Sequence, residues 1–180
     1  MVNIVYIATS LDGFIADKNN ELDWLHEVPN PDGSDFGFSA FMQRIDALVM
    51  GRKTFDKVAG FDCAWPYPKP VFVLSNSMTT VPQGYEDKVF LVHGELKKVV
   101  AELNDKGYNE LYIDGGVTVQ NFLKEDLIDE MIITTIPTIL GGGIPLFGEL
   151  NQPLKFKHVG SERLVDVMVK NRYVRCRNGW

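Results

Sequence analysis

Residues 48–55, Leu-Val-Met-Gly-Arg-Lys-Thr-Phe, decide the fold of this chain. An apolar run ends at Gly51, and two cations and a threonine that suits the start of a helix follow it. This order predicts a buried strand that turns into a helix, whose first N–H groups attract anions while Arg52 and Lys53 add full positive charge. A second strand–glycine–helix junction occurs at 111–116, Leu-Tyr-Ile-Asp-Gly-Gly. Two such junctions in one small domain predict a ligand that carries several phosphates.

The composition favours a single domain over residues 1–180, because 45% hydrophobic and 23% charged residues support a substantial core. The net charge of -6 disfavours nucleic acid and anionic membranes as main partners. No apolar run approaches the roughly 20 residues of a membrane span, and the N-terminus lacks the features of a signal peptide. The two cysteines form no CxxC pair, which predicts a cytoplasmic protein with free thiols and leaves one disulfide open.

Apolar patterns and turn residues predict an α/β fold. The expected strands are 3–9, 46–50, 71–75, 89–92, 110–113 and 128–136, and the expected helices are 36–44, 52–58, 95–107 and 116–125. Residues 10–35 are expected to form a long loop. This alternation predicts three layers, with a mostly parallel twisted sheet, helices on both faces and a C-terminal antiparallel hairpin. In such sheets ligands bind beyond the carboxyl ends of strands, so both glycine junctions could serve one site.

Each of these motifs also has a simpler interpretation. The segment 51–54 alone could be a helix cap with two solvated cations, but the glycines at 115–116 would let a phosphate approach the backbone closely. Ser75 and Asn76 follow the third strand and could accept a ribose phosphate or form a polar turn. Neither junction matches G-x-G-x-x-G or a Walker loop. The three histidines lie far apart without an HExxH pattern, so no metal site is predicted.

Taken together, these segments resemble the dihydrofolate reductase-like superfamily. Residues 7–16, Ile-Ala-Thr-Ser-Leu-Asp-Gly-Phe-Ile-Ala, are similar to its first strand and loop, and 50–55 are similar to its M-G-R-x-T segment. Residues 74–76 and 113–116 match its remaining cofactor turns. Within the superfamily, 139–147, Ile-Leu-Gly-Gly-Gly-Ile-Pro-Leu-Phe, most resemble the reductase domain of riboflavin-biosynthesis proteins and its small standalone bacterial relatives. The resemblance covers nearly the whole chain.

The resemblance implies a homodimeric, NADPH-dependent reductase that transfers hydride to a small heterocycle, such as 5-amino-6-(5-phosphoribosylamino)uracil. The alternatives are a dihydrofolate reductase or a catalytically silent nucleotide-binding module. The chain lacks the H-x-E and C-x-x-C signature of the fused zinc deaminase. The implied cofactor residues lie at the two junctions, the third-strand turn and the first loop: Ala8, Asp12, Gly13, Ile15, Gly51, Arg52, Lys53, Thr54, Leu74, Ser75, Asn76, Asp114, Gly115, Gly116, Val117 and Thr118. Arg52, Lys53, Ser75 and Asn76 would favour the 2′-phosphate of NADPH.

The resemblance also implies a catalytic acid. Asp35 lies 52 − 35 = 17 positions before Arg52, a spacing similar to that of the folate reductase carboxylate, and Thr134 resembles the threonine that assists it. A positioned acid contributes about 10²–10⁴-fold to a rate. Equally, Asp35 could cap a helix that begins at residue 36. Trp24 and Phe41 are expected on the substrate side, although the helical spacing of Phe41 also predicts a core position.

Overall fold

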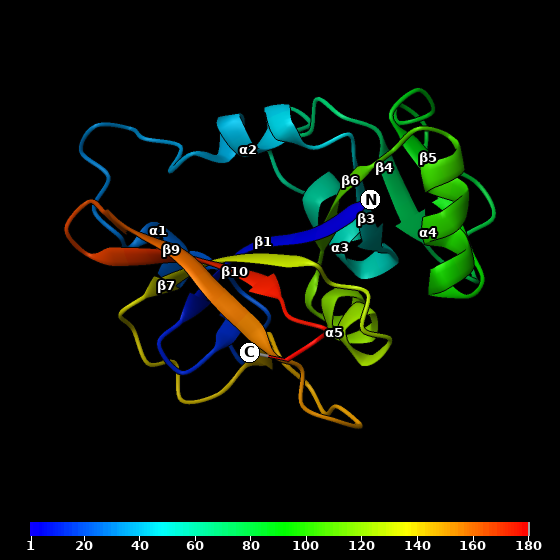
Figure 1. Ribbon diagram of the computed structural model, residues 1–180. Helices are drawn as coiled ribbons and strands as arrows, with labels where there is room; N and C mark the ends of the chain where they lie inside the picture. Colours follow the sequence, from blue (N-terminus) through cyan, green and yellow to red (C-terminus); the bar gives the residue numbers. More distant parts are fainter. Residues whose placement is uncertain (180) are drawn as a thin grey trace.

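The structure, a computed structural model that describes residues 1–179, is built on an eight-stranded sheet (Figure 1). Its strands are β1 (Val2–Ser10), β3 (Ala47–Gly51), β4 (Val71–Leu74), β5 (Val89–Val92), β6 (Glu110–Asp114), β7 (Glu130–Ile136), β9 (Phe156–Leu164) and β10 (Met168–Arg175). They lie in the order β5-β4-β3-β6-β1-β7-β10-β9. The strands from β5 to β7 are parallel, whereas β10 runs antiparallel to both β7 and β9. The predicted parallel sheet with a C-terminal antiparallel hairpin is therefore confirmed.

Helices cover both faces of the sheet, as predicted. On one face α2 (Phe38–Arg44) and α3 (Arg52–Ala59) bury Phe41 and Phe55. On the other face lie α4 (Leu96–Asp105) and α5 (Gly116–Lys124), which bury apolar stripes that include Leu103 and Phe122. The helix expected from residue 36 begins at Phe38, because Phe36 and Gly37 have positive φ angles of 54° and 87°.

The position of β3 inside the sheet explains why residues 47–50 form an uninterrupted apolar run. It pairs with β4 on one side and with β6 on the other, and helices cover both of its faces. Its first four side chains are fully buried, so neither face needs polar residues. Burial of each large side chain here stabilises the fold by about 1.5–3 kcal/mol. The strand is therefore a rigid base for the glycine junction at its carboxyl end.

The expectation of an unbroken loop over residues 10–35 was wrong. This segment contains β2 (Phe14–Ala16) and α1 (Asp23–His26), and β2 pairs with β8 (Ile144–Pro145) in a separate two-stranded antiparallel sheet. Buried Trp24 anchors α1 in a small apolar cluster with Ile136 and Met168. Elements of two to four residues are too short for a periodic pattern to predict them. Among the described helices, none has the length and apolar character needed to cross a bilayer.

Candidate functional site

A cleft of about 1060 Å³ runs along the carboxyl ends of the parallel strands. Both strand–glycine–helix junctions open into it, through residues 51–54 at the start of α3 and residues 114–118 at the start of α5. The two junctions are adjacent because β3 and β6 are neighbours in the sheet, with Met50 paired to Asp114. The unpaired N–H groups of two helix starts thus face one space, which is an arrangement that binds anions.

Gly115 of the second junction lets the two helix starts come into contact, and Gly116 lets the Ile15 side chain pack against the start of α5. Gly115 has a φ of 91°, and a Cβ atom placed on it would overlap the Thr54 hydroxyl oxygen of α3. A Cβ atom on Gly116 would lie 2.7 Å from Cδ1 of Ile15, which also lines the cleft. A side chain at position 115 would meet Thr54 and would need a backbone conformation that other residues rarely adopt, whereas one at position 116 would require the end of the Ile15 side chain to move.

The cations of α3 point in two directions. The Arg52 guanidinium donates a hydrogen bond to the Ser77 hydroxyl (3.2 Å), and it also pairs with Asp56 (3.4 Å). Arg52 is therefore turned toward the segment that follows β4. Lys57 instead donates from Nζ to the carbonyl oxygen of Asn20 (2.5 Å), at the opposite end of the cleft. Lys53 lies one helical turn before Lys57 and so shares its face of α3.

The cleft has two different ends, which suits an elongated ligand. At the β4–β5 end its lining is mostly polar and consists of Ser75, Asn76, His93, Gly94 and Glu95, with Leu74 and Leu96 as its apolar members. At the β1 end the lining is largely apolar and consists of Ile7, Ala8, Ile15, Ala16, Asn20, Leu22, Leu25 and Ile144. Most of the cofactor residues predicted from the sequence line the cleft; Asp12 and Gly13 are not among its lining residues.

A partly buried acid accepts a hydrogen bond from a tyrosine in the wall of the cleft. The carboxylate of Asp114 accepts the N–H of Gly115 (2.8 Å) and the hydroxyl of Tyr67 (3.3 Å). Burial raises the pKa of Asp114 and outweighs these hydrogen bonds, which act in the opposite direction. Burial and the nearby Asp114 likewise raise the pKa of Tyr67. Sequence reasoning missed Tyr67, which lies in a proline-rich loop where no pattern marks its contact with β6.

The predicted acid lies elsewhere. Asp35 accepts the N–H groups of Gly37 (2.9 Å) and Ser39 (2.8 Å) at the start of α2, and it does not line the cleft. Hydrogen bonds from Ser39 and Gly37 lower the pKa of Asp35, whereas a proton donor near neutral pH needs a raised pKa. Gly37, and not Asp35, is the N-cap residue of α2, but Asp35 accepts an N–H of the first helical turn, so the geometry favours a local structural role over an acid.

The other residues expected near the substrate also lie outside the cleft lining. Thr134 is buried in β7, where it pairs with Ala8 of β1 and Lys170 of β10. Trp24 is buried in the apolar cluster of α1. Phe41 is buried in the core and stacks on Tyr6, with 4.4 Å between the ring centroids. The core interpretation of Phe41 thus fits its surroundings.

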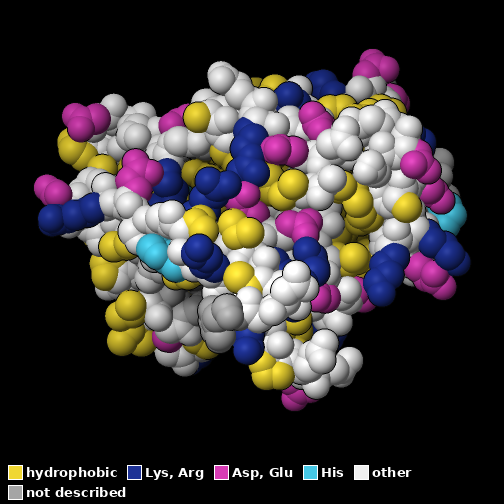
Figure 2. All heavy atoms as spheres, in the orientation of Figure 1, with side chains coloured by type: hydrophobic (Ala, Val, Ile, Leu, Met, Phe, Trp, Pro, Cys, Tyr) yellow, Lys and Arg dark blue, Asp and Glu magenta, His cyan; other side chains and the backbone are white. Residues whose placement is uncertain are grey.

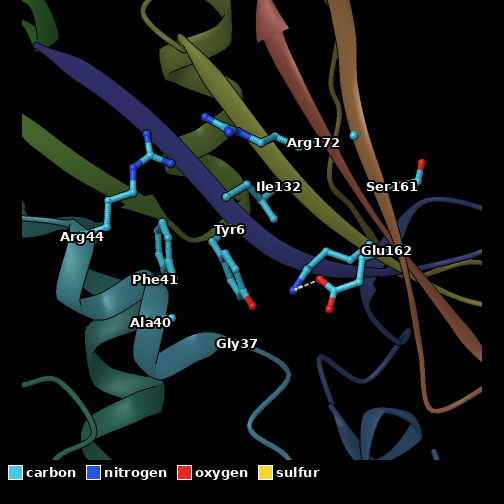
Figure 3. A pocket seen from close by; sticks show the side chains of 11 residues that line it. Tyr6, Gly37, Ala40, Phe41, Arg44, Ile132, Ser161, Glu162 and Arg172 are labelled. Atoms are coloured by element: carbon cyan, nitrogen blue, oxygen red, sulfur yellow. Dashed lines mark ion pairs between the residues drawn. The ribbon is translucent and has the colours of Figure 1, made fainter.

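A second hollow of about 390 Å³ lies between α2 and the strands β1, β7, β9 and β10 (Figure 3). Tyr6, Phe41 and Ile132 contribute apolar surface to it. The charges around it are paired within the chain. The carboxylate of Glu130 accepts hydrogen bonds from Arg44 (2.8 and 2.9 Å) and Arg172 (2.7 and 3.0 Å). At the other end Lys170 pairs with Glu162 at 2.8 Å. Arg44, Arg172 and Lys170 thus each have a carboxylate partner within the chain, as Arg52 of the main cleft has in Asp56.

On the face drawn in Figure 2, basic and acidic side chains are interspersed, with hydrophobic atoms between them. Among residues 1–179, no group of three or more histidine, cysteine, aspartate and glutamate side chains is placed to hold a metal ion. The main cleft is therefore the best candidate site.

Comparison with known proteins gives the chain its family. The uncharacterized protein YwjB of Bacillus subtilis (strain 168) is 37% identical over 176 residues, which cover 96% of this chain and 97% of YwjB. The crystal structure of a putative riboflavin biosynthesis protein from Shewanella sp. PV-4 is 66% identical, with a TM-score of 0.96, and covers 98% of this chain and 100% of that one. A dihydrofolate reductase from Enterococcus faecalis shares the fold alone, at 18% identity and a TM-score of 0.64 over 97% of this chain and 96% of that one. Residues 2–170 match the RibD C-terminal domain, so the chain belongs to this riboflavin-pathway, reductase-like family.

Proposed function

We propose that the protein is an NADPH-dependent reductase that transfers hydride to a small heterocycle related to 5-amino-6-(5-phosphoribosylamino)uracil. One observation carries the proposal: two glycine-bearing helix starts open into a single cleft whose ends differ in polarity. Family membership supports the same reaction class. The nicotinamide cofactor supplies the hydride when bound, and the chain's own residues position the reactants and handle the proton.

The cleft fits a dinucleotide. The starts of α3 and α5 offer backbone N–H groups to a diphosphate in the cleft. Arg52 is turned toward the segment 75–77, so it would bind a phosphate on the adenosine ribose. The apolar β1 end would then receive the nicotinamide and the substrate. Lys53 and Lys57, on the α3 face turned toward this end, would hold the substrate phosphate.

Asp114 is the best candidate to hold the proton that the reduced substrate needs. Its carboxyl group is buried in the cleft wall with a raised pKa, which keeps the protonated form available nearer to neutral pH. Tyr67 contacts it and would pass or orient the proton. The dihydrofolate reductase alternative relies on Asp35, whose carboxylate instead accepts the N–H groups of Gly37 and Ser39 at the start of α2.

The test compares Arg52→Ala with Lys124→Ala, which removes a cleft-lining cation of α5. Fluorescence titrations with NADPH and NADH should show that Arg52→Ala weakens NADPH binding by about 10–100-fold while NADH binding changes little, because a charge-assisted bond is lost. Lys124→Ala should affect the two cofactors equally. Loss of reduced-nicotinamide absorbance with the aminouracil substrate, and none with dihydrofolate, would support the reaction. Equal effects of Arg52→Ala on both cofactors would contradict the assignment of the 2′-phosphate.

A further inference from the structure

Two loops that are far apart in the sequence form one wall of the main cleft. The first loop, residues 11–17, contains β2, and the glycine loop, residues 138–146, contains β8. Besides the β2–β8 pairing, Leu11 N donates to the Thr138 carbonyl oxygen (2.8 Å) and Leu146 N donates to the Gly13 carbonyl oxygen (3.0 Å). Ile15 and Ile144 of these loops line the cleft beside Gly116. The shape of the nicotinamide end therefore depends on how the two loops are held together.

The carboxylate of Asp12 joins these loops. Its Oδ1 atom accepts the Ser10 hydroxyl (2.7 Å) and the N–H of Leu140 (3.1 Å), and its Oδ2 atom accepts the N–H of Gly141 (2.8 Å). The Ser10 oxygen in turn accepts the N–H of Phe14 (2.9 Å). One side chain thus connects the end of β1, the first loop and the glycine loop. The bonds from Ser10, Gly141 and Leu140 lower the pKa of Asp12, so the carboxylate stays ionised at neutral pH.

The glycine loop needs such a connection. Gly141, Gly142 and Gly143 have φ angles of 68°, 151° and 147°, and a Cβ atom on Gly143 would overlap the carbonyl oxygen of Ala16. Glycine permits both the conformation and the close contact, but three consecutive glycines also lose much backbone entropy when they become ordered. Two charge-assisted hydrogen bonds from the start of this segment to Asp12 offset part of that loss.

We propose that Asp12 is a positioning residue, whose carboxylate holds the glycine loop against the first loop so that the cofactor meets a preformed wall. The role differs from a direct cofactor contact, because the carboxylate oxygens are bonded to the loops and Asp12 is not part of the cleft lining. This inference about Asp12 rests on the proposed function only for the effect on NADPH binding. How firmly the two loops are held can be measured without any ligand.

The test uses Asp12→Ala, Asp12→Asn and a matched control, Asp17→Asn. Asp17 lies on the same loop but accepts only nearby N–H groups, those of Asn19 and Glu21. Hydrogen exchange of the ligand-free protein is followed at Leu140 and Gly141, and NADPH affinity is then titrated. Asp12→Ala should speed exchange at both amides and weaken NADPH binding by about tenfold. Asp12→Asn keeps one acceptor oxygen and should fall between Asp12→Ala and wild type, while Asp17→Asn should match wild type.

Each outcome separates this inference from the proposed function. Unchanged exchange at Leu140 and Gly141 in Asp12→Ala would overturn the inference, whatever the cofactor does. Faster exchange with unchanged NADPH affinity would overturn the positioning role. If the wild type bound no NADPH, the proposed function would fail, and faster exchange in Asp12→Ala would still support the connection between the two loops.

Discussion

The contact between the starts of α3 and α5 predicts that Gly115→Ala lowers the free energy of unfolding strongly. The loss should have two separable parts, steric overlap and backbone strain. The new methyl group would overlap the Thr54 hydroxyl oxygen and lie 3.2 Å from the Thr54 Cβ atom. It would also occupy a backbone position with φ 91° and ψ 135°, which alanine adopts only under strain. Strain of this kind costs about 1–3 kcal/mol. Overpacking costs about 1–3 kcal/mol more, so unfolding should become easier by about 2–6 kcal/mol in total.

Two further variants separate these contributions. Gly51→Ala introduces a methyl group 3.0 Å from the Thr118 hydroxyl at an ordinary φ of -78°, so it should cost only about 1 kcal/mol. Thr54→Ala removes the overlapping hydroxyl. Relative to Thr54→Ala alone, the double variant Gly115→Ala/Thr54→Ala should therefore retain the backbone strain of about 1–3 kcal/mol and lose most of the overpacking cost.

Urea denaturation monitored by tryptophan fluorescence gives the free energies of unfolding for this set, without any cofactor. Wild-type stability of Gly115→Ala would refute the packing argument for the junction. Complete recovery in the double variant would refute the strain argument, because removal of a hydroxyl cannot change the φ preference of alanine.

Two other variants test the charged groups. Burial alone would raise the pKa of Glu130, but hydrogen bonds from Arg44 and Arg172 outweigh it and hold the pKa below its usual range. The ion pairs therefore contribute fully above the unfolded pKa of about 4.3 and are lost as pH falls through the folded value. Glu130→Gln should lower the free energy of unfolding by about 2 kcal/mol at pH 7, which is less than the cost of breaking a fully buried pair because both arginines are partly exposed. In thermal melts from pH 7 to pH 3, the melting temperature of this variant should fall less steeply with acid than that of the wild type. For Asp114 stability changes with pH in the opposite direction. Its pKa is raised in the folded state, so its ionisation destabilises the fold as pH rises through the folded value. Asp114→Asn should therefore raise stability at pH 7 by about 0.5–2 kcal/mol while lowering turnover, and a lower melting temperature at pH 7 would contradict the burial argument.

The sheet could be predicted well from the sequence because local residue patterns mark its strands. Residues 47–50 are buried on both faces and so form an unbroken apolar run, and glycines at 51 and 115 mark where strands turn into helices. These local signals, with the rule that ligands bind at strand carboxyl ends, placed both junctions at one edge. The cleft could be located from the sequence for that reason.

The parts that sequence reasoning missed depend on partners far along the chain. The pairing of Ala16 with Ile144 forms β2 across 128 positions, and Tyr67 meets Asp114 across 47 positions. No short-range pattern encodes such contacts. Asp35 shows the converse difficulty, because an aspartate before a helix fits either a cap or an acid until its hydrogen bonds are known.

The place of β1 in the sheet has a consequence for synthesis of the protein on the ribosome. β1 is made first, yet Val2 pairs with Glu110 and Ile4 pairs with Glu130, more than a hundred residues later. At about 5–20 residues per second, the nascent chain carries this apolar strand unpaired for roughly 5–25 seconds. During that time the strand must avoid wrong partners, and chaperones that bind extended apolar segments would shield it. The start of α3 waits for the start of α5, which is synthesised 116 − 52 = 64 residues later, so the cleft between the two helix starts can form only after α5 has been made.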